Sequence, residues 1–263
     1  MICKKIELAE NAFVEVYAPQ KPASYKRDAI LIIPGGGYGE ICDDREGEPI
    51  ALDFMQKGYA CFVLHYSVGE KAKFPRPLIE ASKAMKYIRD NAKEYNINPD
   101  RVFAMGFSAG GHLAASLGIL WHLKEIYDEI DMPYGYNKPT GILPIYPVIS
   151  ANVPTHIWSF YRILGTEDLT KEDREKYSLE MYVDEKSSPA FICHTSTDQA
   201  VPVQNSLCLA TAYANAGIPV ELHIFKDAPH GIALGNEITK CGNEAWLCGG
   251  SWPELAKIWM KNI

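Results

Sequence analysis

Gly106-Phe107-Ser108-Ala109-Gly110 fits the pattern G-x-S-x-G and lies between a short apolar run, 101–105, and a segment of small residues, 109–122. In this pattern the serine sits on a strained turn from a strand into a helix, which exposes its hydroxyl for attack. Glycines two residues to either side let neighbouring backbone approach without a Cβ clash. The bare pattern arises by chance in about one chain in ten of this length. The strand and the helix predicted around it are therefore what marks Ser108 as a candidate nucleophile.

Predicted strands and helices alternate along the rest of the chain. The run 29–33 is continuously apolar, which indicates a strand covered on both faces, whereas 13–17 alternates and ends before Pro19, as an exposed antiparallel edge strand does. Periodicity predicts strands at 13–17, 29–33, 60–66, 101–105, 142–146, 190–194 and 219–225, helices at 48–57, 77–95, 109–122, 206–216 and 253–261, and a turn at 98–100. This alternation predicts an α/β fold, a mostly parallel central sheet with helices on both faces.

A glycine-rich loop, Pro34-Gly35-Gly36-Gly37-Tyr38, directly follows the buried run 29–33. Attack on a carbonyl group develops negative charge on its oxygen, and backbone N–H groups that point at this oxygen stabilise it. Three consecutive glycines let a loop turn its amides inward. A dinucleotide-binding loop requires G-x-G-x-x-G at the start of a helix, and this segment lacks that pattern. We therefore interpret the loop as a candidate oxyanion hole.

A serine nucleophile needs a base and an acid, which follow it in the order Ser, Asp or Glu, His in the fold that G-x-S-x-G suggests. His230 lies just beyond a predicted strand, in a loop where a side chain can reach a cleft, and Asp198 follows the strand that ends near 194. Both should lie at the carboxyl edge of the sheet. The other candidates fit this position less well: Asp184 and Asp227 as the acid, and, as the base, the helical His112 and His122 and the intrastrand His194 and His223.

We expect one domain over residues 1–263, because no repeat, low-complexity tract or linker divides the chain. The stretch 151–188 is longer than an ordinary connection and is a candidate lid or insertion. Within it, the charged run 171–176 is typical of a solvated helix face.

Composition excludes several classes of function. The net charge of −7 disfavours a nucleic-acid partner, which requires a clustered basic surface. The seven cysteines are scattered and show neither C-x-x-C nor zinc-ligand spacing, so we expect no metal and no cofactor. No apolar run approaches the length of a membrane span, and residues 1–7 lack the apolar core of a signal peptide. We therefore expect a cytoplasmic protein without a membrane partner.

Three motifs together resemble the carbohydrate esterase group of α/β-hydrolases, which is similar to acetylxylan esterases. They are Pro34-Gly35-Gly36-Gly37-Tyr38, Glu46-Gly47-Glu48-Pro49 and Gly106-Phe107-Ser108-Ala109-Gly110-Gly111-His112, followed by the late Asp and His. The resemblance implies Ser108, Asp198 and His230 as a catalytic triad and the backbone amides of Gly36, Gly37 and Ala109 as the oxyanion hole. Many members of the wider group carry His where this chain has Pro34, so the hydrogen bonds that support the loop are expected to differ.

The sequence thus predicts a serine esterase that acts on short acyl esters, with acetylated sugars or xylo-oligosaccharides as the expected small-molecule substrates. Two alternatives remain open: an amide or peptide hydrolase similar to aryl-formamidases or small aminopeptidases, and a catalytically silent sugar-binding relative. Tyr38, directly after the oxyanion glycines, is expected to shorten the acyl pocket, and Trp158 is a candidate for stacking on a sugar. Assembly into a homo-oligomer is compatible with the sequence.

Overall fold

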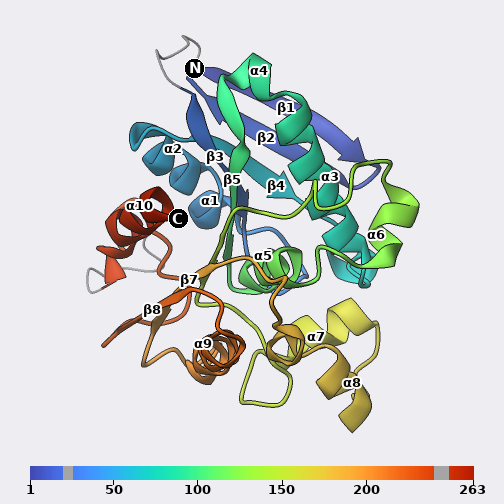
Figure 1. Ribbon diagram of the computed structural model, residues 1–263. Coiled ribbons are helices and arrows are strands. Elements are labelled where there is room, and N and C mark those ends of the chain that lie inside the picture. Colours follow the sequence, from blue (N-terminus) through green and yellow to red (C-terminus); the bar gives the residue numbers. More distant parts are fainter. Residues whose placement is uncertain (20–25, 240–248) are drawn as a thin grey trace.

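Eight strands form one sheet in the computed structural model, which describes residues 1–19, 26–239 and 249–263 (Figure 1). The spatial order is β1-β2-β4-β3-β5-β6-β7-β8. The pairs β1–β2 and β2–β4 are antiparallel, and every other pair is parallel. The bounds are β1 Ile2–Ala9, β2 Ala12–Ala18, β3 Arg27–Ile33, β4 Ala60–His65, β5 Ile97–Phe107, β6 Ile142–Ile145, β7 Ala190–Thr195 and β8 Val220–Phe225.

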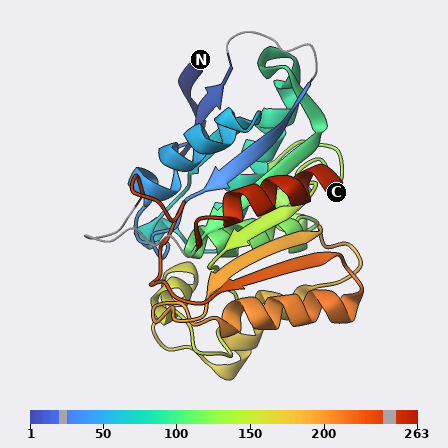
Figure 2. The ribbon, with the colours of Figure 1, turned by 90° about the vertical axis from the view of Figure 1, so that its left-hand side faces the viewer.

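Helices cover both faces of the sheet (Figures 1 and 2). The longer ones are α2 Glu48–Gln56, α3 Arg76–Asp90, α5 Ala109–Ile119, α7 Ile157–Leu164, α9 Gln204–Ala216 and α10 Trp252–Asn262. The shorter ones are α1 Asp43–Glu46, α4 Ala92–Tyr95, α6 Lys124–Glu129, α8 Lys171–Lys176 and the 3₁₀ turns Gly69–Lys71 and Leu179–Tyr182. The predicted architecture, a mostly parallel sheet between two helical layers, is confirmed.

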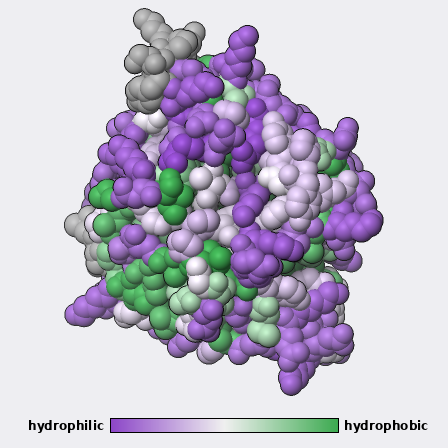
Figure 3. Space-filling model, viewed as in Figure 1, coloured by the Kyte–Doolittle hydropathy of each residue, from purple (hydrophilic) through white to green (hydrophobic). Residues whose placement is uncertain are grey.

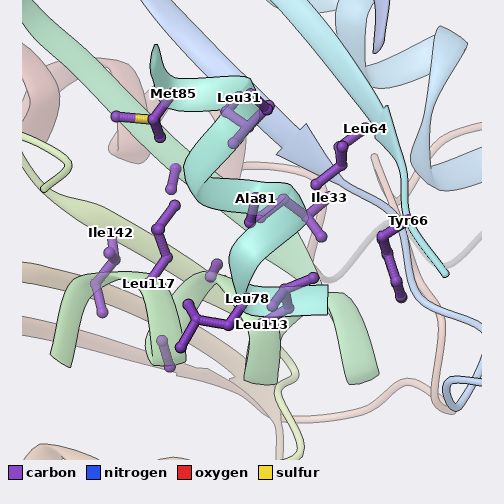
Figure 4. Packing of buried hydrophobic residues seen from close by; sticks show 14 of the residues in the cluster. Leu31, Ile33, Leu64, Tyr66, Leu78, Ala81, Met85, Leu113, Leu117 and Ile142 are labelled. Atoms are coloured by element: carbon purple, nitrogen blue, oxygen red, sulfur yellow. The ribbon is translucent and has the colours of Figure 1, made fainter. Parts of the chain in front are cut away.

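Strand β3 shows why the sheet is buried on both faces. Leu31 and Ile33 belong to the apolar cluster that packs against α3, α5 and α9, and Figure 4 shows Leu31 near Met85 and Ile33 near Ala81, both of α3. Ile32, which points to the other face, belongs to the cluster beneath α2 and α10. Because side chains alternate along a strand, the continuous apolar run 29–33 supplies both cores at once.

The structure differs from the sequence prediction in three ways. Strand β2 is not an edge, because β1 pairs outside it. Residues 98–100, predicted as a turn, lie inside β5, where the pairing with β3 shifts register between Arg27 and Ala29. The strand therefore absorbs the Asn-Pro-Asp sequence as an irregularity instead of starting after it. The predicted helix 77–95 is divided at Asn91 into α3 and α4.

Charged and polar residues cover much of the face seen in Figure 3, and apolar residues gather toward its lower left, in the region of β7, β8 and α9. Leu207 of α9 and Ile224 of β8 are among the exposed apolar side chains. Across the described ranges, the helices are all too short or too polar to traverse a lipid bilayer.

Candidate active site

Ser108 occupies a sharp turn between β5 and α5. Its backbone has φ 54° and ψ −118°, in the region with positive φ that residues other than glycine rarely adopt. A Cβ atom at Gly106 would lie 2.0 Å from the carbonyl oxygen of Gly110, and one at Gly110 would lie 2.1 Å from that of Ile33. Both glycines are therefore required by close backbone approach, and the turn presents the serine side chain at the carboxyl edge of the sheet.

The structure brings Ser108, His230 and Asp198 into one hydrogen-bonded chain, although they follow three different strands. Nε2 of His230 lies 2.8 Å from Oγ of Ser108, and Nδ1 lies 2.6 Å from Oδ2 of Asp198. With the imidazole proton on Nδ1, this nitrogen donates to the carboxylate and Nε2 accepts from the serine hydroxyl. That tautomer is the one a general base for serine requires.

Asp198 is held in its charged form by several donors. Its Oδ1 accepts hydrogen bonds from the amides of Ala200 (3.0 Å) and Val201 (2.9 Å). Burial acts to raise the pKa of this carboxyl, but hydrogen bonds from His194, His230 and the Val201 amide outweigh it and hold the pKa well below its usual range. The acid is therefore ionised at neutral pH and can stabilise an imidazolium on His230.

The loop that carries His230 is fixed to the end of β7. The hydroxyls of Thr195 and Thr197 both donate to the carbonyl oxygen of Ala228, at 3.0 Å and 3.1 Å. The ring of Tyr146, at the end of β6, packs edge-on against the imidazole with 5.1 Å between centroids. These contacts limit the orientations that the imidazole can take.

The glycine-rich loop lies beside the serine, because Gly36 and Gly37 line the same pocket as Ser108. Gly36 and Gly37 have φ values of 120° and 60°, which glycine adopts without strain. The Gly36 carbonyl accepts from the amides of Gly39 and Glu40, and the Gly37 carbonyl accepts from Arg162 of α7 at 2.9 Å. Throughout the described parts of the chain, no protein atom accepts a hydrogen bond from the amides of Gly36, Gly37 or Ala109. These three N–H groups can thus bind an oxyanion formed at Ser108.

A cavity of about 280 Å³ opens onto Ser108 and His230. Its remaining walls are mostly polar or charged, and the side chains that contribute are Glu40, Cys42, Arg45, Glu46, His156, Arg162 and Ala200. Arg162 and His156 come from the segment 151–188, which places α7 beside the glycine-rich loop.

The model of the BD-FAE family matches residues 14–213, which include the glycine-rich loop, Ser108 and Asp198. This chain belongs to the BD-FAE family. Among curated relatives of this BD-FAE chain, endo-1,4-beta-xylanase B of Butyrivibrio fibrisolvens is 37% identical over 81% of the chain and 33% of the relative. The acetylxylan esterase of Xylanibacter ruminicola is 33% identical over 83% of the chain and 43% of the relative. The chain thus spans less than half the length of these two curated relatives.

Solved structures confirm that the BD-FAE chain has the α/β-hydrolase fold. An α/β hydrolase from a deep-sea metagenome library is 34% identical, with a TM-score of 0.80 over 100% of this chain and 97% of the other. An acetyl ester-xyloside bifunctional hydrolase from Caldicellulosiruptor lactoaceticus is 32% identical, with a TM-score of 0.84 over 98% of this chain and 96% of the other.

The two predicted substrate contacts of the BD-FAE chain lie elsewhere. Tyr38 does not shorten the pocket: it has φ 60°, is 2% exposed, and directs its hydroxyl into the core, 2.8 Å from Nδ1 of His112. Trp158 is 51% exposed, packs edge-on against Tyr161, and is not part of the pocket wall. Two residues before it, His156 reaches the pocket instead.

The sequence did not reveal three supporting residues in this BD-FAE site. The hydroxyl of Tyr66 donates to the Pro34 carbonyl at 2.9 Å, which anchors the start of the loop. Arg162 anchors the far end at Gly37. Glu46 accepts a hydrogen bond from the Gly35 amide at 2.7 Å. The motif Glu46-Gly47-Glu48-Pro49 was the available signal for Glu46, but the motif alone does not show which of its two carboxylates is buried.

One group of side chains has the composition of a cation site. Ligand atoms of Glu15, Asp43 and His65 lie within 4.8 Å of one another. Burial lowers the pKa of His65, and the two carboxylates act in the opposite direction. None of the three lines the pocket that contains Ser108.

Proposed function

We propose that this chain is a carboxylic-ester hydrolase that works through an acyl-enzyme on Ser108. The observation that carries this proposal is the hydrogen-bonded chain Ser108–His230–Asp198, at 2.8 Å and 2.6 Å. Relatives whose names describe esterases support the same reaction class.

The residues have distinct roles in the proposed reaction. Oγ of Ser108 attacks the ester carbonyl carbon while Nε2 of His230 takes its proton, and the amides of Gly36, Gly37 and Ala109 bind the resulting oxyanion. Collapse of the tetrahedral intermediate breaks the bond to the alcohol, which receives the proton from His230. Water, activated by the same imidazole, then cleaves the acyl-enzyme and restores the serine.

The proposed substrates are short acyl esters of sugars, in particular acetylated xylo-oligosaccharides. Two relatives bear on this: one is named acetylxylan esterase and another an acetyl ester-xyloside bifunctional hydrolase. The pocket supports it because charged and polar side chains such as Glu40, Arg45 and Arg162 can bind sugar hydroxyls.

A substrate panel tests the proposal. Purified protein is assayed on p-nitrophenyl acetate, butyrate and hexanoate, on acetylated xylo-oligosaccharides, and on aminoacyl and aryl amides, with Ser108→Ala as the control. We expect kcat/KM to fall with acyl length, acetate to be released from the oligosaccharides, and the amides to react slowest. Amide turnover that equals ester turnover would favour the peptidase alternative, and kcat/KM that climbs from acetate to hexanoate would refute the short-acyl assignment. No turnover of any ester would indicate a silent relative.

A further inference from the structure

Glu46 is a carboxylate buried next to the proposed reaction centre. It is the last residue of α1, is 2% exposed, and forms no hydrogen bond within its own helix through its side chain. Oε2 accepts from the amide of Gly35 at 2.7 Å, and Oε1 accepts from the hydroxyl of Tyr146 at 3.0 Å. Each carboxylate oxygen therefore contacts a different segment of the site.

The contact with Gly35 lies directly against the nucleophile. A Cβ atom at Gly35 would lie 2.7 Å from Oε2 of Glu46 and 2.9 Å from Cβ of Ser108. Gly35 is thus enclosed between the carboxylate and the serine turn. Gly35 precedes Gly36 and Gly37, which line the pocket, so the bond from its amide to Glu46 fixes the start of the glycine-rich loop.

The contact with Tyr146 connects Glu46 to the loop that carries His230. The hydroxyl of Tyr146 donates its proton to Glu46 and accepts a hydrogen bond from the amide of Ala233 at 3.1 Å, three residues beyond His230. The same ring packs edge-on against the imidazole, with an angle of 74° between the planes. A single carboxylate is therefore connected, through one tyrosine, to the loop that carries the base.

A carboxylate suits this position because it offers acceptors to two donors in different directions. Burial raises the pKa of the Glu46 carboxyl, while the Gly35 amide, the nearby His230 and the Tyr146 hydroxyl act in the opposite direction. Burying a carboxylate is costly unless its hydrogen bonds are satisfied, and removing it would leave the Gly35 N–H and the Tyr146 hydroxyl without an acceptor in a dry environment.

We propose that Glu46 is a positioning residue that holds the oxyanion loop and the His230 loop in register around Ser108. This inference rests on the proposed function. An ester in its ground state needs the loop amides little, whereas the tetrahedral transition state depends on them, so an error in the loop's position lowers kcat and leaves KM nearly unchanged. A role in folding alone would lower the melting temperature and leave kcat of the folded protein intact.

The test compares Glu46→Ala, Glu46→Gln and Tyr146→Phe with wild type and with Glu48→Gln, which removes the same charge from an exposed position two residues away. Thermal unfolding, kcat and KM on p-nitrophenyl acetate, and inhibition by a trifluoromethyl ketone are measured. The ketone adds to the serine and carries an oxyanion, so its affinity reports the loop amides without turnover. Ser108→Ala is assayed alongside.

We expect Glu46→Ala to lower kcat about 100-fold, with KM within about threefold of wild type and a parallel loss of ketone affinity. Glu46→Gln keeps an acceptor for Gly35 and should recover kcat to within about tenfold of wild type. Tyr146→Phe should lower kcat about tenfold, and Glu48→Gln should match wild type.

A folded Glu46→Ala protein with kcat and ketone affinity within about threefold of wild type would overturn the inference. If that variant does not fold, wild-type kcat in both Glu46→Gln and Tyr146→Phe overturns it. Ser108→Ala separates the two proposals: substantial turnover by this variant refutes the proposed function, whereas an inactive Ser108→Ala with fully active Glu46 variants refutes only the role of Glu46.

Discussion

Replacing Asp198 by asparagine exchanges one oxygen for an NH₂ group, and the structure determines which way the new amide faces. Oδ1 accepts from the amides of Ala200 and Val201, so an NH₂ group there would face two donors. The nitrogen therefore takes the place of Oδ2, 2.6 Å from Nδ1 of His230. It donates to Nδ1, the imidazole proton moves to Nε2, and Nε2 can no longer accept the proton of Ser108.

The change of tautomer predicts a large loss of activity in Asp198→Asn. We expect kcat of Asp198→Asn to fall about 10³- to 10⁴-fold at neutral pH, which corresponds to about 4–5 kcal/mol in the barrier. KM should change little, because the substituted atom faces the imidazole and not the pocket wall. Initial rates on p-nitrophenyl acetate, measured after circular dichroism shows an intact fold, give both constants.

Asp227→Asn is the matched control. Its side chain is 61% exposed and lies three residues before His230, so the change removes the same charge near the same loop. This variant should keep kcat within about twofold of wild type. If Asp198→Asn retains more than a tenth of wild-type kcat, Asp198 does not orient the base and the reasoning fails.

Three further predictions concern Ser108, His230 and the buried His112. Ser108→Ala should abolish ester turnover without lowering the melting temperature by more than a few degrees, and a variant that retains a tenth of wild-type activity would exclude Ser108 as the nucleophile. His230→Ala should lower kcat as much as the serine change, whereas His223→Ala should affect mainly stability; the reverse ranking in paired assays would reassign the base. Burial lowers the pKa of His112 to about 4, so the unfolded chain binds an extra proton between pH 6.5 and pH 4, and the unfolding free energy should fall by about 3 kcal/mol as the pH is lowered across that window. Urea titrations at both pH values should show a smaller change for His112→Gln, and an equal change would refute this.

The sequence predicted the arrangement of Ser108, Asp198 and His230 because that arrangement depends on local signals. Each residue directly follows a strand that its apolar pattern reveals, and parallel strands bring their carboxyl ends to one edge. The position just beyond a strand, together with the order Ser, Asp, His, favoured His230 over four other histidines and Asp198 over Asp184 and Asp227. Their hydrogen-bonded geometry in the structure agrees with that selection, and assays on the variants decide their roles.

The features that could not be predicted from the sequence depend on backbone direction and on contacts between residues far apart in the chain. Tyr38 follows two glycines, and nothing in its neighbours indicates the φ of 60° that turns it into the core. Glu46 lies in a charged segment typical of a surface turn, yet it is buried because Gly35 and Tyr146, 11 and 100 residues away, converge on it. Strand β1 displaced β2 from the edge because 2–9 alternates in the same way as 13–17, and alternation alone does not give the order of strands.

The bond from Arg162 to the Gly37 carbonyl has a consequence for anyone who recombines parts of such proteins. The insertion 151–188 and the glycine-rich loop are more than 100 residues apart in the chain, but the guanidinium of one fixes a peptide plane of the other at 2.9 Å. Exchanging the insertion to alter substrate range would therefore also remove a support of the loop that faces Ser108. The two segments should therefore be exchanged together, and a chimera should take both from the same parent protein.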